Sequence, residues 1–108
     1  AQLLDRLGGA SGGTAIIHPT AFVSPTAVLG AGVFIGPTAV VHTLARVGAH
    51  AIVNTGAIVE HECVIGPNAH LAPNATLGGN CRVGEGALVG IGDVADRARV
   101  RGVPAREW

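Results

Sequence analysis

A short segment of the sequence gathers side chains that can transfer protons. His61 lies between Glu60 and Glu62, and His70 follows nine residues later. Histidine is the side chain best suited to proton transfer near neutral pH, and a neighbouring carboxylate orients its ring and favours the imidazolium. His61 is therefore a candidate general base. We assign Glu62 as its carboxylate partner because Glu60 falls at the end of a predicted strand; the alternative is an ordinary polar surface triplet.

These residues lie within a six-residue repeat that must position them. Ile, Val or Leu occupies every sixth position from Ile17 to Val89, and a second column of small or apolar residues runs four positions further on until Asp93 interrupts it. A helix of 3.6 residues per turn would scatter both columns around its surface, which excludes one long α-helix. The repeat predicts short strands joined by corners, three to a triangular coil, with the branched side chains inside.

The repeat predicts an all-β fold in three parts. Residues 17–92 would form a parallel β-helix of about four coils, with strands stacked ~4.8 Å apart. Residues 1–16 indicate a helix remnant followed by a Gly/Ser linker, and residues 93–108 indicate an irregular tail. Cys63 and Cys81 fall one coil apart in the small column. Their spacing permits a disulfide; the alternative is two free, core-packed cysteines.

Residues just before each aliphatic position should point outward, because neighbours alternate along a strand. Most of them are apolar, which is typical of an interface, and a closed trimer would cover such faces without forming fibres. We therefore expect a homotrimer. The stacking predicts two outer columns: Phe22, Val40 and Ile58 on one face, and Phe34, Ile52 and Leu88 with His70 on another.

Composition and charge argue against several classes of protein. Apolar residues make up 48% of the chain and the formal net charge is zero, which argues against disorder and against nucleic-acid binding. No apolar stretch reaches the ~18 residues that span a membrane, and no signal-peptide pattern is present, so we expect a cytoplasmic protein. Five of the seven arginines lie at or after position 82. They either meet phosphates or form a solvated tail.

The sequence resembles the hexapeptide-repeat sugar acetyltransferases of the NeuD and PglD type. The likeness covers residues 17–92 and rests on the run IVEHECVIG with the later His70. It includes VNTG at 53–56, LGGN at 77–80, GIG at 90–92 and the closing GVPAR at 102–106. The resemblance implies a left-handed β-helix that transfers acetyl from acetyl-CoA to an amino or hydroxyl group of a sugar, often a nucleotide-linked one.

The resemblance also implies roles for individual residues. His61 would be the general base, tuned by Glu62, and Asn54 would lie near the acceptor. His70 and Ile91 would line a coenzyme groove between subunits. Acetyl-CoA is the implied cosubstrate, and no metal is expected. The acceptor attacks the thioester directly, so Cys63 need not be a nucleophile.

The chain departs from this family in two ways. Family members carry an N-terminal nucleotide-sugar-binding domain, and they continue with further coils before GVPAR. We hypothesise that a coil is missing at the Gly92–Asp93 junction, which would remove part of the coenzyme groove and put activity in doubt.

Three other functions are open to a β-helix. A non-catalytic trimeric scaffold or regulatory subunit needs no site at all. A γ-class carbonic anhydrase-like metal site would resemble a family with two His five residues apart, a spacing that this chain lacks. Ice binding would need a longer threonine column than Thr20 and Thr38, which are followed by Gly56 and Asn74.

Overall fold

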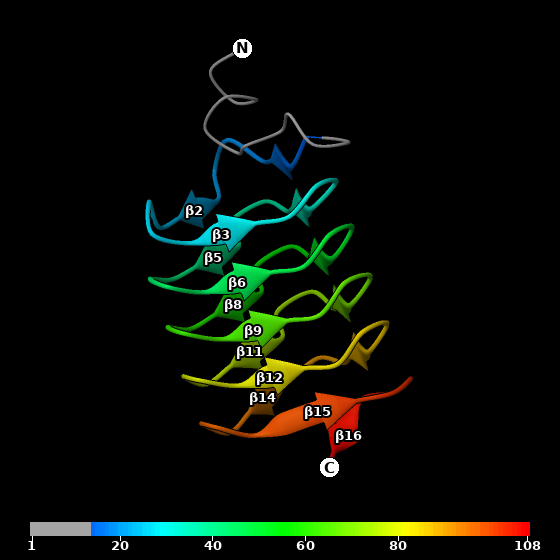
Figure 1. Cartoon of the computed structure of the whole chain (residues 1–108). Helices are drawn as coiled ribbons and strands as arrows, with labels where there is room; N and C mark the ends of the chain where they lie inside the picture. The colour runs from blue at the N-terminus through cyan, green and yellow to red at the C-terminus, as the bar shows by residue number, and fades with distance from the viewer. Residues whose placement is uncertain (1–13) are drawn as a thin grey trace.

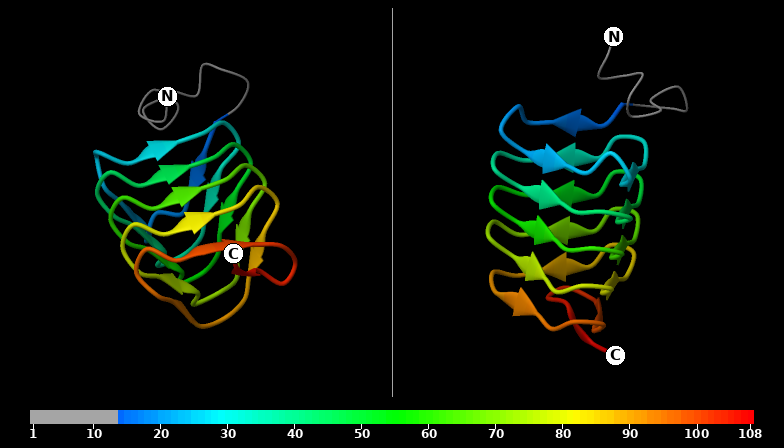
Figure 2. Two further views of the ribbon diagram at one scale, coloured as in Figure 1. Left: turned by 60° about the horizontal axis from the view of Figure 1, so that its bottom comes forward. Right: turned by 90° about the vertical axis from the view of Figure 1, so that its left-hand side faces the viewer.

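Short strands stacked in three sheets form the described part of this computed structural model, residues 14–108 (Figure 1). The three sheets are the walls of a triangular solenoid, and successive coils lie on one another along its axis (Figure 2). The first strand begins at Ile16, one residue before the predicted boundary. The helix and linker predicted for residues 1–16 lie almost wholly outside the described residues.

Each wall takes every third strand of the chain. Sheet A contains β1 (Ile16–Ile17), β4 (Phe34–Ile35), β7 (Ile52–Val53), β10 (His70–Leu71) and β13 (Leu88–Val89). Sheet B contains β2 (Phe22–Val23), β5 (Val40–Val41), β8 (Ile58–Val59), β11 (Thr76–Leu77) and β14 (Asp93–Val94). Sheet C contains β3 (Val28–Leu29), β6 (Arg46–Val47), β9 (Val64–Ile65), β12 (Arg82–Val83), β15 (Arg99–Arg101) and β16 (Arg106–Glu107).

The core is made of the two columns that the repeat predicted. Parallel pairing joins residues 18 apart, such as Ile35 with Val53, so each branched side chain lies on an equivalent one in the next coil. From Ile35 to Val89 these side chains are at most 4% exposed, and the Ala and Cys column is as well buried. The predicted all-β hexapeptide solenoid is confirmed. Sheets A and B each contain five strands and give about five turns, one more than predicted, because strands continue past Gly92.

The coil continues past Gly92, where we expected an irregular tail. Asp93 pairs with Thr76, and Val94 with Leu77, which is an offset of 17 residues instead of 18. The corner at 90–92 is one residue short, and Gly92 closes it with φ 129°, a conformation that L side chains rarely adopt. After this shift Val100 is buried again. Strand pairing therefore continues across the junction with a shift of one residue. The hypothesis of a missing coil stays a prediction.

A left-handed residue three positions after the aliphatic residue turns each corner from Gly32 onward, except the shortened one. Its backbone N–H donates to a carbonyl of the preceding coil in most corners, as Asn80 does to His61 at 2.8 Å. These residues are Gly32, Thr38, Leu44, His50, Gly56, Glu62, Asn68, Asn74, Asn80, Gly86 and Arg97. Because Glu62 shares this conformation with the other corners, its positive φ belongs to the repeat and is not strain peculiar to a site.

The two cysteines are free and fully buried in the small column. Each thiol donates to a backbone carbonyl of the next coil: Cys63 Sγ to Gly78 at 3.1 Å and Cys81 Sγ to Ala95 at 3.0 Å. Burial raises the pKa of the Cys63 thiol from 9.0 to about 11, and burial also raises the pKa of Cys81. The interpretation as free core residues is confirmed, and neither thiol is prepared to act as a nucleophile.

These raised pKa values predict a loss of stability in alkali. Between pH 9 and 11 the Cys63 thiol ionises in the unfolded chain but stays protonated in the folded one, so the free energy of unfolding falls with rising pH. Cys63 alone accounts for about 3 kcal/mol across this window. Denaturant unfolding at fixed protein concentration from pH 8 to 11 measures the fall. The chain has no Tyr or Lys to titrate there.

Cys63→Ala is the matched control for this measurement. It should flatten the pH dependence of the free energy of unfolding while Cys81 preserves a smaller slope. An unchanged slope in the variant would contradict the assignment.

Candidate active site

His61 and Glu62 form a hydrogen-bonded pair at the corner between β8 and β9. His61 Nδ1 lies 3.1 Å from Glu62 Oε1, and both side chains are about half exposed. An ionised carboxylate can only accept, so Nδ1 carries the proton and donates it to Glu62. The other ring nitrogen, Nε2, is then unprotonated in the neutral imidazole. This is the arrangement that a general base needs.

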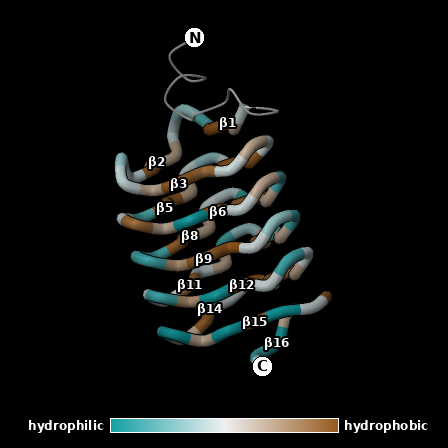
Figure 3. Tube along the Cα trace, in the orientation of Figure 1, coloured by the Kyte–Doolittle hydropathy of each residue, from teal (hydrophilic) through white to brown (hydrophobic). Residues whose placement is uncertain are grey.

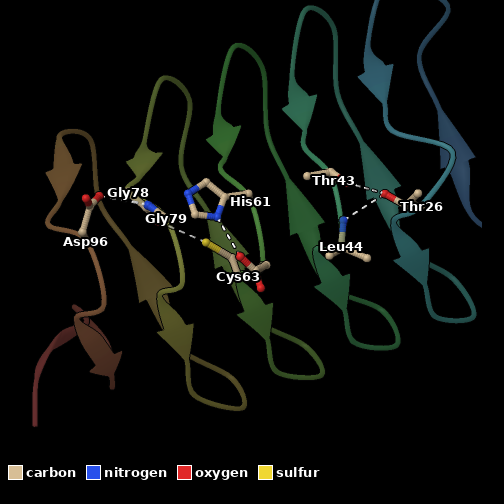
Figure 4. Close-up of polar contacts among 9 residues, drawn as sticks. Thr26, Thr43, Leu44, His61, Cys63, Gly78, Gly79 and Asp96 are labelled. Atoms are coloured by element: carbon tan, nitrogen blue, oxygen red, sulfur yellow. Dashed lines mark hydrogen bonds and ion pairs between the residues drawn. The ribbon is translucent and has the colours of Figure 1, made fainter.

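The Nε2 edge of His61 lies against Gly79 in the next coil (Figure 4). A Cβ on Gly79 would overlap Nε2, and a Cβ on Gly78 would overlap the carboxylate of Asp96. Gly79 therefore makes room for the imidazole of His61, and Gly78 makes room for Asp96. The Gly79 N–H donates to Asp96 Oδ1 at 3.0 Å, which brings a further carboxylate to this corner.

Asp96 is a site neighbour that sequence reasoning missed. It lies in the column of His61 and Gly79 only because the corner at 90–92 is one residue short. A count in sixes places it one position out of phase. The signal was present in the sequence, because aliphatic residues return at Val94, five positions after Val89, and at Val100, six positions after Val94.

Glu60, the other neighbour of His61, is directed elsewhere. Its Oε2 lies 3.5 Å from Nε2 of His42 in the preceding coil. The centroid of the His42 ring is 6.3 Å from that of the Phe22 ring. The choice of Glu62 as the partner of His61 therefore agrees with the observed contacts.

Asn54 and His70 form a second pair, on sheet A. Asn54 Oδ1 accepts the Thr55 N–H at 2.7 Å, which orients the amide so that Nδ2 donates to His70 Nε2 at 3.1 Å. A neutral His70 must then carry its proton on Nδ1. His70 lies between Ile52 and Leu88 in the sheet register. This tautomer gives His70 a free N–H donor.

One chain does not bring all the expected residues together. His61 and Glu62 lie at the corner between sheets B and C, whereas Asn54 and His70 lie on sheet A and its following corner. Ile91 is 78% exposed in the shortened corner. The width of sheet B separates the two groups, so they would meet only where one copy of the chain packs against another.

Two classes of feature are not found in residues 14–108. No group of three or more His, Cys, Asp or Glu side chains is placed to hold a metal ion. No helix in this part of the chain is long and apolar enough to cross a membrane.

The sequence matches a known repeat family over its central coils. Two overlapping stretches, residues 44–79 and 56–91, match the bacterial transferase hexapeptide (six repeats). Residues 44–91 therefore carry the hexapeptide repeat of this family. No curated protein matches it significantly in sequence.

Several solved structures share this hexapeptide-repeat fold. The acetyltransferase domain of PglB from Neisseria gonorrhoeae, in complex with acetyl coenzyme A, is 33% identical over 87% of this chain and superposes with a TM-score of 0.68. Serine acetyltransferase from Vibrio cholerae is 27% identical over 84% of the chain, with a TM-score of 0.79. GDP-perosamine N-acetyltransferase from Caulobacter crescentus is 30% identical over 87%, but its TM-score of 0.49 supports no comparison of sites.

The hexapeptide-repeat chain is shorter than these neighbours. It spans 57% of the PglB domain, 39% of the serine acetyltransferase and 56% of the perosamine enzyme. All three neighbours are named as acetyltransferases, and the PglB domain was solved with acetyl coenzyme A bound. The resemblance of the sequence to this class is confirmed.

The contact between His61 and Gly79 can be tested without any substrate. Gly79→Ala should push the exposed imidazole aside and lengthen its hydrogen bond to Glu62, because the new methyl group occupies the position of Nε2. The ring can swing into solvent, so the free energy of unfolding should change by less than about 1 kcal/mol. NMR chemical shifts of the His61 ring report the change.

Gly90→Ala is the matched control, because a Cβ at Gly90 meets nothing within 4 Å. If the His61 resonances respond equally to both substitutions, or to neither, the packing of the ring on Gly79 is refuted.

Proposed function

We propose that this hexapeptide-repeat protein is an acetyltransferase that moves acetyl from acetyl-CoA to an amino or hydroxyl group of a sugar, with His61 as the general base. The observation that carries the proposal is the His61–Glu62 pair at 3.1 Å, which leaves Nε2 of the neutral ring unprotonated. The 33% identity to the acetyl-CoA-bound PglB domain supports it.

The chemistry follows from the protonation of His61. The acceptor nitrogen or oxygen attacks the thioester carbonyl carbon while Nε2 takes its proton. Glu62 stabilises the resulting imidazolium through Nδ1–H. The carbon–sulfur bond then breaks, and His61 returns the proton to the departing thiolate. The reaction needs no acyl-enzyme intermediate. This agrees with the raised pKa of Cys63, which keeps its thiol protonated and poorly nucleophilic.

The oxyanion of the tetrahedral intermediate needs a hydrogen-bond donor. Two backbone N–H groups near His61 are already engaged, Gly79 with Asp96 and Asn80 with the His61 carbonyl. His70 has a free Nδ1–H when neutral, because Nε2 accepts from Asn54. The free Nδ1–H makes His70 a candidate donor to the oxyanion. From the resemblance to the sugar acetyltransferases, we also propose that His70 and Ile91 line the coenzyme groove and that Asn54 lies near the acceptor.

The two groups of residues would meet in a homotrimer. Sheets A and B carry the predicted apolar outer columns, in register, and Phe22 and Phe34 are 52% and 36% exposed. Packing sheet A of one copy beside the corner between sheets B and C of another would place His70 opposite His61. Burial of these apolar columns supplies the driving force.

The acceptor and the location complete the proposal. We infer a nucleotide-linked sugar from the likeness to the sugar acetyltransferases, although the fold itself also serves the serine acetyltransferase of Vibrio cholerae. A cytoplasmic location is consistent with two free, buried cysteines.

Removal of the base is the direct test of this mechanism. His61→Ala should lower kcat by about 10²- to 10⁴-fold, the usual contribution of a general base, with no change in oligomer size by light scattering. His18→Ala removes a partly exposed histidine whose side chain forms hydrogen bonds only with Thr20, and it should leave kcat unchanged. Full turnover by His61→Ala would refute the assignment and favour a non-catalytic scaffold.

Substitution of His70 should change the KM for acetyl-CoA more than it changes kcat. His70→Ala removes one donor and should raise the KM for acetyl-CoA about tenfold, the value of one good hydrogen bond. Steady-state kinetics at varied acetyl-CoA measure it, and His70→Asn should recover part of the loss. A fall in kcat at unchanged KM would contradict the coenzyme contact and would instead indicate that His70 donates to the oxyanion.

A further inference from the structure

The positive charges of the described chain collect on one wall. All six arginines of residues 14–108 lie on sheet C or at the corner leading into it: Arg46, Arg82, Arg97, Arg99, Arg101 and Arg106. Sheets A and B present mainly apolar outer residues instead. Figure 3 shows the hydrophilic colour on parts of β12 and β15. These two strands hold three of the six arginines, and Arg106 in the adjacent β16 is a fourth.

Neighbouring strands place these arginines side by side. Arg82 pairs with Arg99 across β12 and β15, and Arg101 pairs with Arg106 across β15 and β16. Strands lie about 4.8 Å apart and alternate residues about 7 Å apart. Four guanidinium groups therefore arise from a small area of backbone at the C-terminal end of the wall.

Trp108 holds part of this cluster in place. Its ring lies 4.8 Å from the Arg101 guanidinium carbon and 5.3 Å from that of Arg99. The C-terminal strand returns antiparallel to β15, and the Trp108 N–H donates to the Arg99 carbonyl at 3.0 Å. These cation–π contacts orient two guanidinium groups together on the outer face.

No arginine of this cluster forms an ion pair within the described residues. The two ion pairs found among the described residues both join His to Glu, and no carboxylate lies within 4.0 Å of an arginine there. Glu107 is the only acidic residue in a sheet C strand, and Glu85 lies at the next corner. Like charges opposite one another destabilise a sheet, so an external anion would relieve the repulsion.

We propose that Arg82, Arg99 and Arg101, with Trp108, form a binding site for the diphosphate group of a soluble organic ligand. Arginine binds phosphate oxygens through paired N–H donors, and two neighbouring phosphates fit the spacing of these strands. The diphosphate has two possible sources, coenzyme A or a nucleotide-linked sugar. This choice of sources rests on the proposed function, whereas the anion site itself does not.

Trp108 gives a local readout, because it is the only tryptophan in the chain. When inorganic pyrophosphate is titrated into the full chain, the fluorescence of Trp108 should change and then reach a plateau as the site saturates. The double variant Arg82→Gln/Arg99→Gln should weaken pyrophosphate binding at least tenfold, since hydrogen bonds to charged groups are lost. Arg46→Gln is the matched control, two strands away on the same wall, and should change the affinity less than about twofold. Circular dichroism verifies that each variant is folded.

Competition then identifies the source. Displacement of pyrophosphate by coenzyme A assigns the site to the acetyl donor, and displacement by UDP-N-acetylglucosamine assigns it to the acceptor; either result supports the proposal. The absence of pyrophosphate binding, equal affinity in the double variant, or displacement by neither ligand overturns it. Binding to phosphatidylglycerol vesicles in place of pyrophosphate also overturns it. His61→Ala should bind pyrophosphate normally, so failure of the catalytic assignment is distinguishable from failure of this site.

Discussion

Burial of one branched side chain per six residues is the constraint on which this structure depends. Each such side chain lies on its equivalent 18 residues away, and the backbone ladder between coils follows from that alignment. Small residues in the second column let the three walls approach one another closely. Because the corners must then project outward at fixed intervals, the interior lattice also determines where polar groups can appear.

The catalytic corner illustrates this dependence. His61 and Glu62 are chain neighbours, but the room for the imidazole comes from Gly79, one coil later. Asp96 joins the same corner by way of a coil shortened by one residue. The corner that is one residue short does not interrupt strand pairing here. It shifts the phase of every later residue and so changes which side chains share a column.

The three walls differ in chemistry, and this difference organises the proposed function. Sheets A and B carry apolar outer columns suited to packing against other copies, while sheet C carries the arginines. In the proposed homotrimer the first two walls would be covered, and the corner that holds His61 would lie between a covered wall and the cationic one. Acetyl-CoA and a nucleotide-linked sugar both contain a diphosphate group. The positive charge of the sheet C arginines would therefore attract either substrate toward His61.

The sequence alone determined the solenoid, its inward columns, the two apolar outer columns and the adjacency of His61 to Glu62, because all of these follow from a strict period along the chain. It also supported free cysteines at Cys63 and Cys81. Tertiary structure decided the contacts between coils: Asn54 with His70, Glu60 with His42, and Trp108 with Arg99 and Arg101. Tertiary structure also decided that residues 93–101 continue the solenoid. Counting in sixes cannot predict the contacts between coils or the strands after Gly92. Side-chain direction at a corner, and the phase of the repeat after a shortened coil, are set by packing in three dimensions.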